Sequence, residues 1–175
     1  MVARIKSLLS FPNPVNEVAA RVVAGVVVLM CVTAIALRQQ WLLVAVAYGF
    51  WARTLTGPKL SPLGLLATRV VAPRLGPAKL VAGPPKRFAQ AMGAGFSTAA
   101  VTLWFGFSEH LAAWGVVGAL VAAASLESFA GYCLGCRIFS LLMSAGVIPR
   151  GVCEACGDLR LRHPELAIRQ GVGVL

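Results

Sequence analysis

Four long apolar segments dominate this chain of 175 residues and constrain its fold more than any other feature. A helix needs about 20 apolar residues to cross the roughly 30 Å hydrocarbon core of a bilayer. Each segment reaches or approaches that length, and the four lie at residues 18–37, 41–56, 88–107 and 111–132. The sequence therefore predicts an all-α membrane protein with four transmembrane helices arranged as two hairpins.

The composition argues against other classes of protein. Hydrophobic residues make up 58% of the chain and charged residues only 13%, whereas a soluble domain carries about 25% charged residues. A disordered chain would have low hydrophobicity instead. Two buried helical hairpins in a soluble protein are the alternative, but they would leave almost no polar face for water.

The first apolar segment shares some features with a secretory signal peptide. Arg4 and Lys6 precede it, and Ala34 and Ala36, on either side of Ile35, resemble the small residues of a cleavage site. However, its apolar stretch is longer than the 7–15 residues of a typical signal core, and another apolar segment follows at once. We therefore predict that it is retained as a helix.

The basic residues predict the orientation, because cytoplasmic loops carry an excess of Lys and Arg. All but two of the 16 basic residues lie before the first segment, in or beside the loop at 57–87, or after the fourth segment; Arg21 and Arg38 are the exceptions. Both termini and this loop are therefore expected to face the cytoplasm. The net charge of +10 then needs no nucleic-acid partner, since the basic residues do not gather in one stripe.

The loop at 57–87 is rich in proline and contains one helix signal. Ser61 and Pro62 resemble a capping hydroxyl followed by proline in the first turn. Leucine and valine residues at 63–71 would line one side of a short helix, and Pro73 would end it. Such an amphipathic helix suits the membrane interface, and the alternative is a solvated loop near anionic headgroups.

Two ionisable residues, Arg21 and Glu127, fall inside the apolar segments. A charge in the bilayer is unfavourable unless it is paired, so we predict a salt bridge between them. Alternatively, Glu127 exchanges protons with the cysteines that follow it. Glu127 precedes Cys133 by six residues, so only a helix break at Gly131 would bring the two side chains together.

Four of the five cysteines form two CxxC pairs on the predicted cytoplasmic side, Cys133 with Cys136 and Cys153 with Cys156. The cytoplasm is reducing, so permanent disulfides are not expected there. The spacer of 16 residues between the pairs matches a four-thiolate structural zinc site, to which all four cysteines would contribute.

Thiol redox chemistry is the other interpretation of the cysteine pairs. A helix that begins at the first cysteine would lower its pKa, and Arg137 would also favour the thiolate. Cys133 and Cys136 would then form the reactive pair, with Cys153 and Cys156 as a resolving pair. Simple packing on glycine-rich turns is the third reading, and it is the expected role of the isolated Cys31.

The first cysteine pair belongs to a longer motif, since residues 131–136 read Gly-Tyr-Cys-Leu-Gly-Cys. The chain resembles a functionally uncharacterised family of bacterial integral membrane proteins. The resemblance rests on this motif, on Asn-Pro-Val-Asn at 13–16, and on the proline-bearing stretches at 57–62 and 84–90. That family's hallmark is a last transmembrane helix ending in Phe-Cys-(Leu or Val)-Gly-Cys, and Tyr132 replaces the phenylalanine here. The resemblance implies a multi-pass protein of the bacterial plasma (inner) membrane.

The resemblance also bears on the chemistry. Many members carry only the first CxxC, and two thiolates alone cannot complete a structural zinc site. Members often occur near thioredoxin-like or rhodanese-like proteins, which implies such a soluble partner or a larger membrane complex. The resemblance therefore favours thiol chemistry, whereas the second pair keeps zinc open.

These patterns predict a transmembrane domain at 1–136 and a cytoplasmic tail at 137–175. The leading hypothesis is thiol–disulfide or sulfur-handling chemistry with a soluble partner. The alternative is a non-catalytic accessory or docking subunit with a tail folded by zinc. A transporter or channel is disfavoured because no polar pathway crosses the apolar segments.

Overall fold

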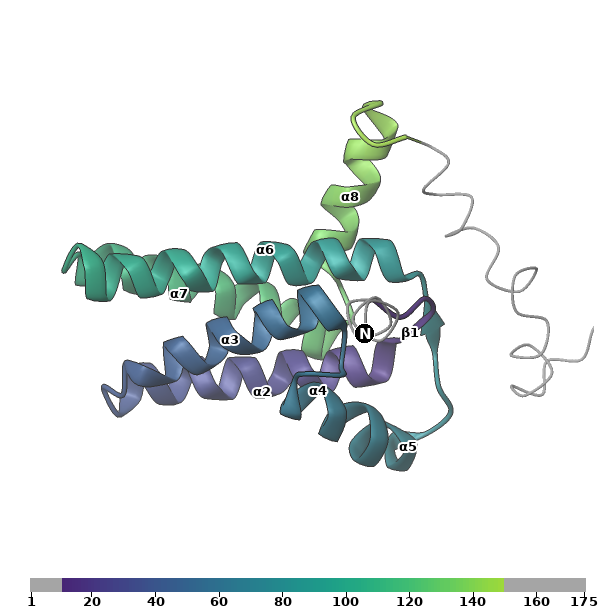
Figure 1. The fold of residues 1–175 in the computed structure, drawn as a ribbon, viewed down its shortest axis with the longest axis horizontal. Helices are drawn as coiled ribbons and strands as arrows, with labels where there is room; N and C mark the ends of the chain where they lie inside the picture. The colour runs from purple at the N-terminus through teal and green to yellow at the C-terminus, as the bar shows by residue number, and fades with distance from the viewer. Residues whose placement is uncertain (1–10, 150–175) are drawn as a thin grey trace, which may run out of the picture.

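Four long helices lie side by side in the computed structural model, which describes residues 11–149 (Figure 1). The first hairpin joins α2 (Glu17–Ala36) to α3 (Trp41–Thr56), and the second joins α6 (Gly83–Val101) to α7 (His110–Ser125). The π-helical turns η2 (Thr102–Gly106) and η3 (Leu126–Ala130) extend α6 and α7. The expected all-α fold is confirmed.

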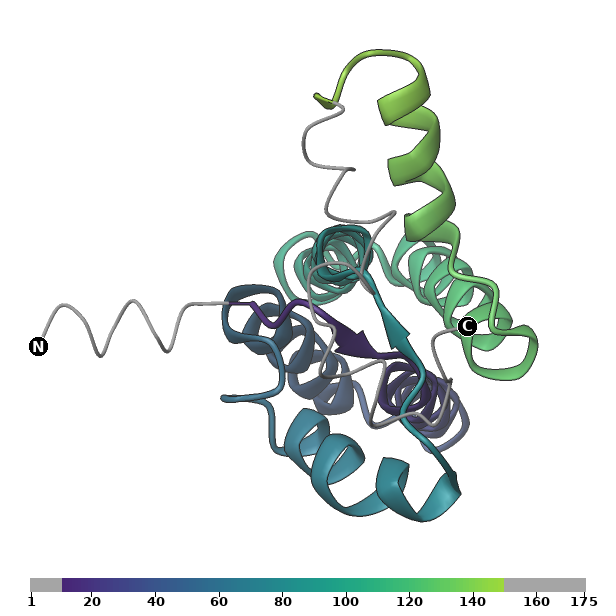
Figure 2. The same ribbon diagram turned by 90° about the vertical axis from the view of Figure 1, so that its right-hand side faces the viewer.

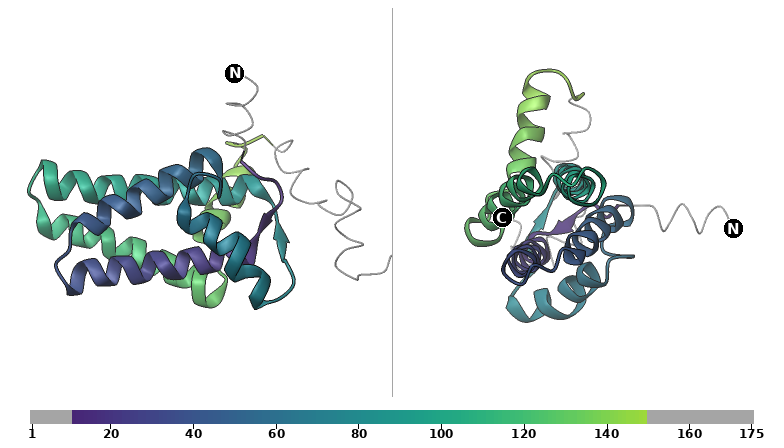
Figure 3. Two further views of the ribbon diagram at one scale, coloured as in Figure 1. Left: turned by 60° about the horizontal axis from the view of Figure 1, so that its bottom comes forward. Right: turned by 90° about the vertical axis from the view of Figure 1, so that its left-hand side faces the viewer.

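Both hairpin turns lie at one end of the bundle, and all other segments lie at the opposite end, which we call the α8 end (Figure 1). There, β1 (Val15–Asn16) pairs antiparallel with β2 (Leu80–Val81). Two helical arms lie on opposite sides of the bundle near this end, where one stands out from the bundle and the other packs along α2 (Figures 2 and 3). One arm is α8 (Leu134–Ser144), and the other is the continuous run of α4 (Pro62–Leu66), η1 (Ala67–Val71) and α5 (Ala72–Leu75).

The core of the bundle is built from side chains of all four long helices. Its buried members include Val27, Leu43, Phe50, Ala94 and Val117. Helix α6 is central, because it packs against α3, α7 and α8. Gly93 on α6 leaves the space that the Phe50 ring fills, since a Cβ there would overlap the ring.

The second arm corrects one expectation. Ser61 caps α4 as predicted, with its hydroxyl accepting a hydrogen bond of 3.1 Å from the Gly64 N–H. Pro73 does not end the helix, which continues to Leu75 and stops at Gly76 with φ of +135°. In the π-helical turn η1, the Ala72 N–H donates its hydrogen bond to the Ala67 carbonyl, five residues earlier. The backbone has therefore already left the α-helical hydrogen-bond pattern directly before Pro73.

By length and composition, two of the helices could cross a membrane, namely Glu17–Ala36 with 20 residues and His110–Ala130 with 21. The 16 residues of α3 span only about 24 Å. Helix α6 is longer, but it begins at Gly83 rather than near Phe88 and includes Lys86 and Arg87 in its first turns. Of the four expected spans, length and composition thus support two within residues 11–149.

Candidate functional site

A sharp break after η3 places the first cysteine pair at the start of α8. Gly131 has φ of +66°, a left-handed conformation that glycine adopts without strain. The chain then turns, and Cys133 becomes the N-cap residue of α8 with extended backbone angles. The helix therefore breaks at Gly131. Such a break was the condition for bringing Glu127 close to the cysteines.

The two sulfur atoms of this pair lie close together. The Cys133 Sγ accepts hydrogen bonds from the Cys136 N–H at 3.4 Å and from the Cys136 thiol at 2.8 Å. Both cysteines are free thiols. Cys133 is buried and Cys136 is half-buried, so Cys136 is the more exposed of the two cysteines.

A buried ion pair stands beside the thiols. Lys86 on α6 donates a hydrogen bond of 2.7 Å from Nζ to Oε1 of Glu127 on η3. Their side chains are only 8% and 15% exposed, so water screens the pair little. The ammonium group of Lys86 also lies near enough to Cys133 and Cys136 to interact electrostatically with both sulfurs.

This ion pair replaces the salt bridge expected between Arg21 and Glu127, which does not form. Arg21 instead donates from Nη2 to the Phe129 carbonyl at 3.4 Å. That carbonyl is freed by the helix break, and basic side chains commonly satisfy such groups at helix ends. Glu127 pairs with Lys86 because α6 begins five residues earlier than expected and so carries Lys86 to it.

The two thiols have opposite pKa shifts. The pKa of Cys133 lies below the ordinary value, first because the Cys136 thiol donates a hydrogen bond to its sulfur. Lys86 and the Cys136 N–H act in the same direction, while burial and Glu127 act against it. The pKa of Cys136 is raised, because its thiol is the donor in that hydrogen bond and because it is partly buried. The pair therefore holds its first negative charge on Cys133 and keeps a proton on Cys136.

Close packing of α8 against α6 fixes the thiols near Lys86. A Cβ on Gly135 would lie 2.5 Å from the Ala89 Cβ and 2.6 Å from its Cα. Gly135 therefore allows the close approach of α8 to α6. At Gly115 and Gly118, by contrast, such a Cβ would have no atom within 4 Å in the described part of the chain.

Cys133 opens into an apolar cavity of about 310 Å³ between the helices. Glu127 and Cys133 line one part of the cavity, and the remaining lining is largely apolar, including Val27, Phe50 and Leu120. The dithiol therefore lies next to a space that would accept an apolar molecule.

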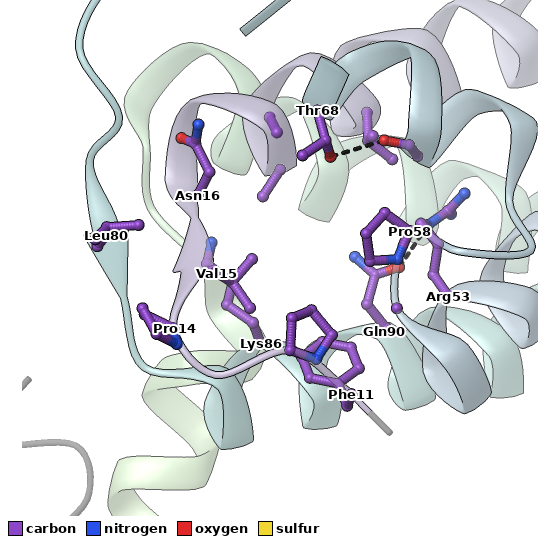
Figure 4. A pocket seen from close by; sticks show the side chains of 16 residues that line it. Phe11, Pro14, Val15, Asn16, Arg53, Pro58, Thr68, Leu80, Lys86 and Gln90 are labelled. Carbon is purple, nitrogen blue, oxygen red and sulfur yellow. Dashed lines mark hydrogen bonds between the residues drawn. The ribbon is translucent and has the colours of Figure 1, made fainter. Parts of the chain in front are cut away.

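A second cavity, of about 250 Å³, lies at the α8 end and is lined by Lys86 and Gln90 of α6 (Figure 4). The buried Arg53 also borders it and donates from Nε to Gln90 Oε1 at 2.9 Å. Gln90 lines both cavities, while Lys86 lines this one and Glu127 lines the other. The Lys86–Glu127 pair thus stands between the two spaces.

The other predicted site residues are not brought to this place. Cys153 and Cys156 lie outside the described residues. Within residues 11–149, no three His, Cys, Asp or Glu side chains come close enough to hold a metal ion. Cys31 is fully buried in the core, in the packing role expected for it. Arg137, expected to favour the thiolate, lies over the Tyr132 ring at 5.2 Å.

Lys86 is the site residue that the sequence did not identify, since it was counted among the basic residues of a loop. The two prolines before Lys86 were a usable sequence signal, because proline is favoured in the first turn of a helix. Pro84 and Pro85 therefore indicate a helix that starts before Lys86, as the structure has it. No local pattern, however, pairs Lys86 with Glu127.

Comparisons with known proteins identify the family but no activity. No curated protein and no solved structure matches the chain. A family described as a domain of unknown function, DUF4395, matches over residues 15–144, which include all four long helices, the first cysteine pair and α8. The chain therefore belongs to the DUF4395 family.

Proposed function

We propose that this protein is a membrane-embedded dithiol–disulfide exchange protein, with Cys133 and Cys136 as its reactive pair. The observation that carries the proposal is the position of Cys133 at the N-cap of α8, with its sulfur 2.8 Å from that of Cys136. The buried Lys86–Glu127 pair beside it provides a charged environment that simple packing cysteines would not need.

The proposed membrane setting has four spans, formed by α2, α3, α6 with η2, and α7 with η3. Large apolar side chains are exposed along the whole length of these helices, and they include Leu29, Trp41, Trp51, Phe96, Phe107 and Leu111. In the two longest apolar helices, only 33% and 22% of the most apolar stretch is buried inside the protein. Exposed apolar surface of this extent is typical of contact with lipid.

The α8 end is proposed to face the cytoplasm. The basic residues of α4 to α6 lie there, while the opposite end carries Arg38 in its first hairpin turn. The two arms flank the bundle near this end and expose Leu66, Leu75, Ile138 and Leu141. They are thus suited to the interface between headgroups and acyl chains, and their position gives a soluble partner access to Cys136.

Exchange begins with the pair oxidised and a reduced dithiol protein as partner. The partner's thiolate attacks the Cys136 sulfur, the bond to Cys133 breaks, and the electron pair leaves on Cys133. The partner's second thiol then loses its proton and attacks the partner sulfur that is bonded to Cys136. The partner's disulfide forms, and Cys136 leaves as a thiolate and takes up a proton. The partner is oxidised to a disulfide, and the pair is reduced by two electrons.

The structure favours this direction of attack for two reasons. Cys136 is the more exposed of the two cysteines. Cys133 has the lower pKa, and a thiol of lower pKa is the better leaving group.

A trapping experiment tests the proposal. The oxidised full-length protein in detergent is mixed with a reduced thioredoxin that retains only its attacking cysteine, and the adduct is mapped by mass spectrometry. We expect a mixed disulfide at Cys136, and none in the Cys136→Ala variant. An adduct at Cys133 would reverse the assigned roles, and the absence of any adduct would refute exchange.

A further inference from the structure

The apolar cavity beside Cys133 identifies a class of electron acceptor for the dithiol. The cavity of about 310 Å³ lies at the lower end of the range for small-molecule sites, about 300–1,000 Å³. Gly93 and several alanines of α7 are among the residues that line it. Charged and thiol groups lie only where Glu127 and Cys133 line it.

The cavity is not sealed from the outside of the bundle. Phe96 on α6 and Ile138 on α8 both line it and are 41% and 37% exposed. Ala119 on α7 lines it and is also exposed. In the proposed membrane setting, this side of the bundle faces acyl chains, so a lipid-soluble molecule would enter sideways.

We propose that this cavity binds the ring of a membrane quinone, which oxidises the Cys133–Cys136 dithiol. This inference rests on the proposed function and names its second substrate. A quinone ring is flat and largely apolar, and its isoprenoid tail would extend past Phe96 and Ile138 into the lipid. A quinone also accepts two electrons, the number that a dithiol releases when it forms a disulfide.

The reaction balances with groups present at the site. The Cys133 thiolate adds to a ring carbon and forms an S–C bond. Cys136 then loses its proton and attacks the Cys133 sulfur, so that the S–S bond forms and the S–C bond breaks with its electron pair left on the ring. The hydroquinone takes up two protons, one from Cys136 and one from water.

The Lys86–Glu127 pair is placed to supply the proton from water. Glu127 borders the apolar cavity, and Lys86 borders the second cavity at the α8 end (Figure 4). A proton that enters the second cavity therefore needs to cross only this hydrogen-bonded pair to reach the ring.

The division of the two thiols fits this assignment. Cys133, the buried sulfur that holds the negative charge, lines the apolar cavity. Cys136, the more exposed of the two cysteines, does not line it and is left for the soluble partner. Electrons would thus enter through one thiol and leave through the other.

The test uses the reduced full-length protein in detergent without oxygen, with decylubiquinone as the probe. We expect one quinone reduced for each Cys133–Cys136 disulfide formed, measured by ultraviolet absorbance and by mapping the thiols. Cys133→Ala should abolish the reduction. Ala119→Phe, at the mouth of the cavity, should slow it at least tenfold.

A matched control lies three residues away on the same helix. Ala122 is also exposed but does not line the cavity, so Ala122→Phe should leave the rate unchanged. If Ala119→Phe does not fold, Phe96→Ala provides a second variant, because loss of this lining ring should weaken quinone binding and raise the KM.

The outcomes separate this inference from the function on which it rests. Each variant is also assayed for disulfide exchange with a soluble thioredoxin. Exchange without quinone reduction, or equal rates for Ala119→Phe and Ala122→Phe, would overturn the quinone site and leave the exchange function standing. Co-purification of a phospholipid in the cavity, with no quinone reduction, would likewise reject it. Absence of both activities in the wild-type protein would reject the exchange function itself.

Discussion

Replacing Gly135 with alanine should push α8 away from α6 and so disturb the thiol site. The new Cβ would lie 2.5 Å from the Ala89 Cβ and 2.6 Å from its Cα, whereas non-bonded carbons prefer about 3.5–4.0 Å. Helix α8 would therefore have to retreat by about 1 Å to restore normal contact distances. Such overpacking typically destabilises a protein by about 1–3 kcal/mol.

The matched control for Gly135→Ala is Gly95→Ala, in the helix against which α8 packs. A Cβ at Gly95 meets nothing within 4 Å among the described residues. Alanine is more favourable than glycine in a helix interior by about 1 kcal/mol, so Gly95→Ala should raise the free energy of unfolding slightly. The two substitutions are chemically identical and should have opposite signs.

Both effects on the free energy of unfolding are measured by denaturant titration in detergent, with unfolding monitored by circular dichroism. A second readout is the rate of alkylation at Cys133, which should change in Gly135→Ala because α8 carries this thiol away from Lys86. If Gly135→Ala were as stable as Gly95→Ala and alkylated like the wild type, the packing of α8 against α6 would be wrong.

The remaining predictions concern the ion pair and two backbone positions. Lys86→Met should raise the pKa of Cys133 and Glu127→Gln should lower it, because the two charges act on that thiol with opposite signs; the pH dependence of alkylation should shift up and down accordingly. Lys86→Met alone should also lower the free energy of unfolding by about 3–5 kcal/mol, since it leaves the buried carboxylate of Glu127 unpaired. Denaturant titrations should show that adding Glu127→Gln restores much of the lost stability. Gly131→Ala should cost about 1–2 kcal/mol because its φ is +66°, measured in the same way. Ser61→Ala should cost about 0.5–2 kcal/mol through loss of the helix cap, and hydrogen exchange should increase in α4.

The long apolar segments made the helices predictable from the sequence. The residues of α3 coincide with the predicted segment, and α2 differs from it by one residue at each end. The helix cap at Ser61 and the break at Gly131 were also predictable, because a side-chain oxygen and a left-handed glycine each leave a local signal. Local patterns of this kind depend on only a few neighbouring residues.

The ion pair at the site could not be predicted in the same way. Glu127 and Lys86 are 41 residues apart, and their contact depends on how α6 packs against the end of η3. The expected pairing of Glu127 with Arg21 assumed a helix that continued past Phe129. Once the chain breaks there, Arg21 meets a backbone carbonyl instead of a carboxylate.

A redox titration of the Cys133–Cys136 pair tests the central claim most directly. The full-length protein in detergent is equilibrated in glutathione buffers of increasing potential, free thiols are alkylated, and each cysteine is quantified by mass spectrometry. We predict a single two-electron transition that these two residues share, at a potential within the range of about −120 to −270 mV known for exchange-active dithiols. Cysteines that stay reduced at every potential, or that oxidise independently of each other, would contradict the account.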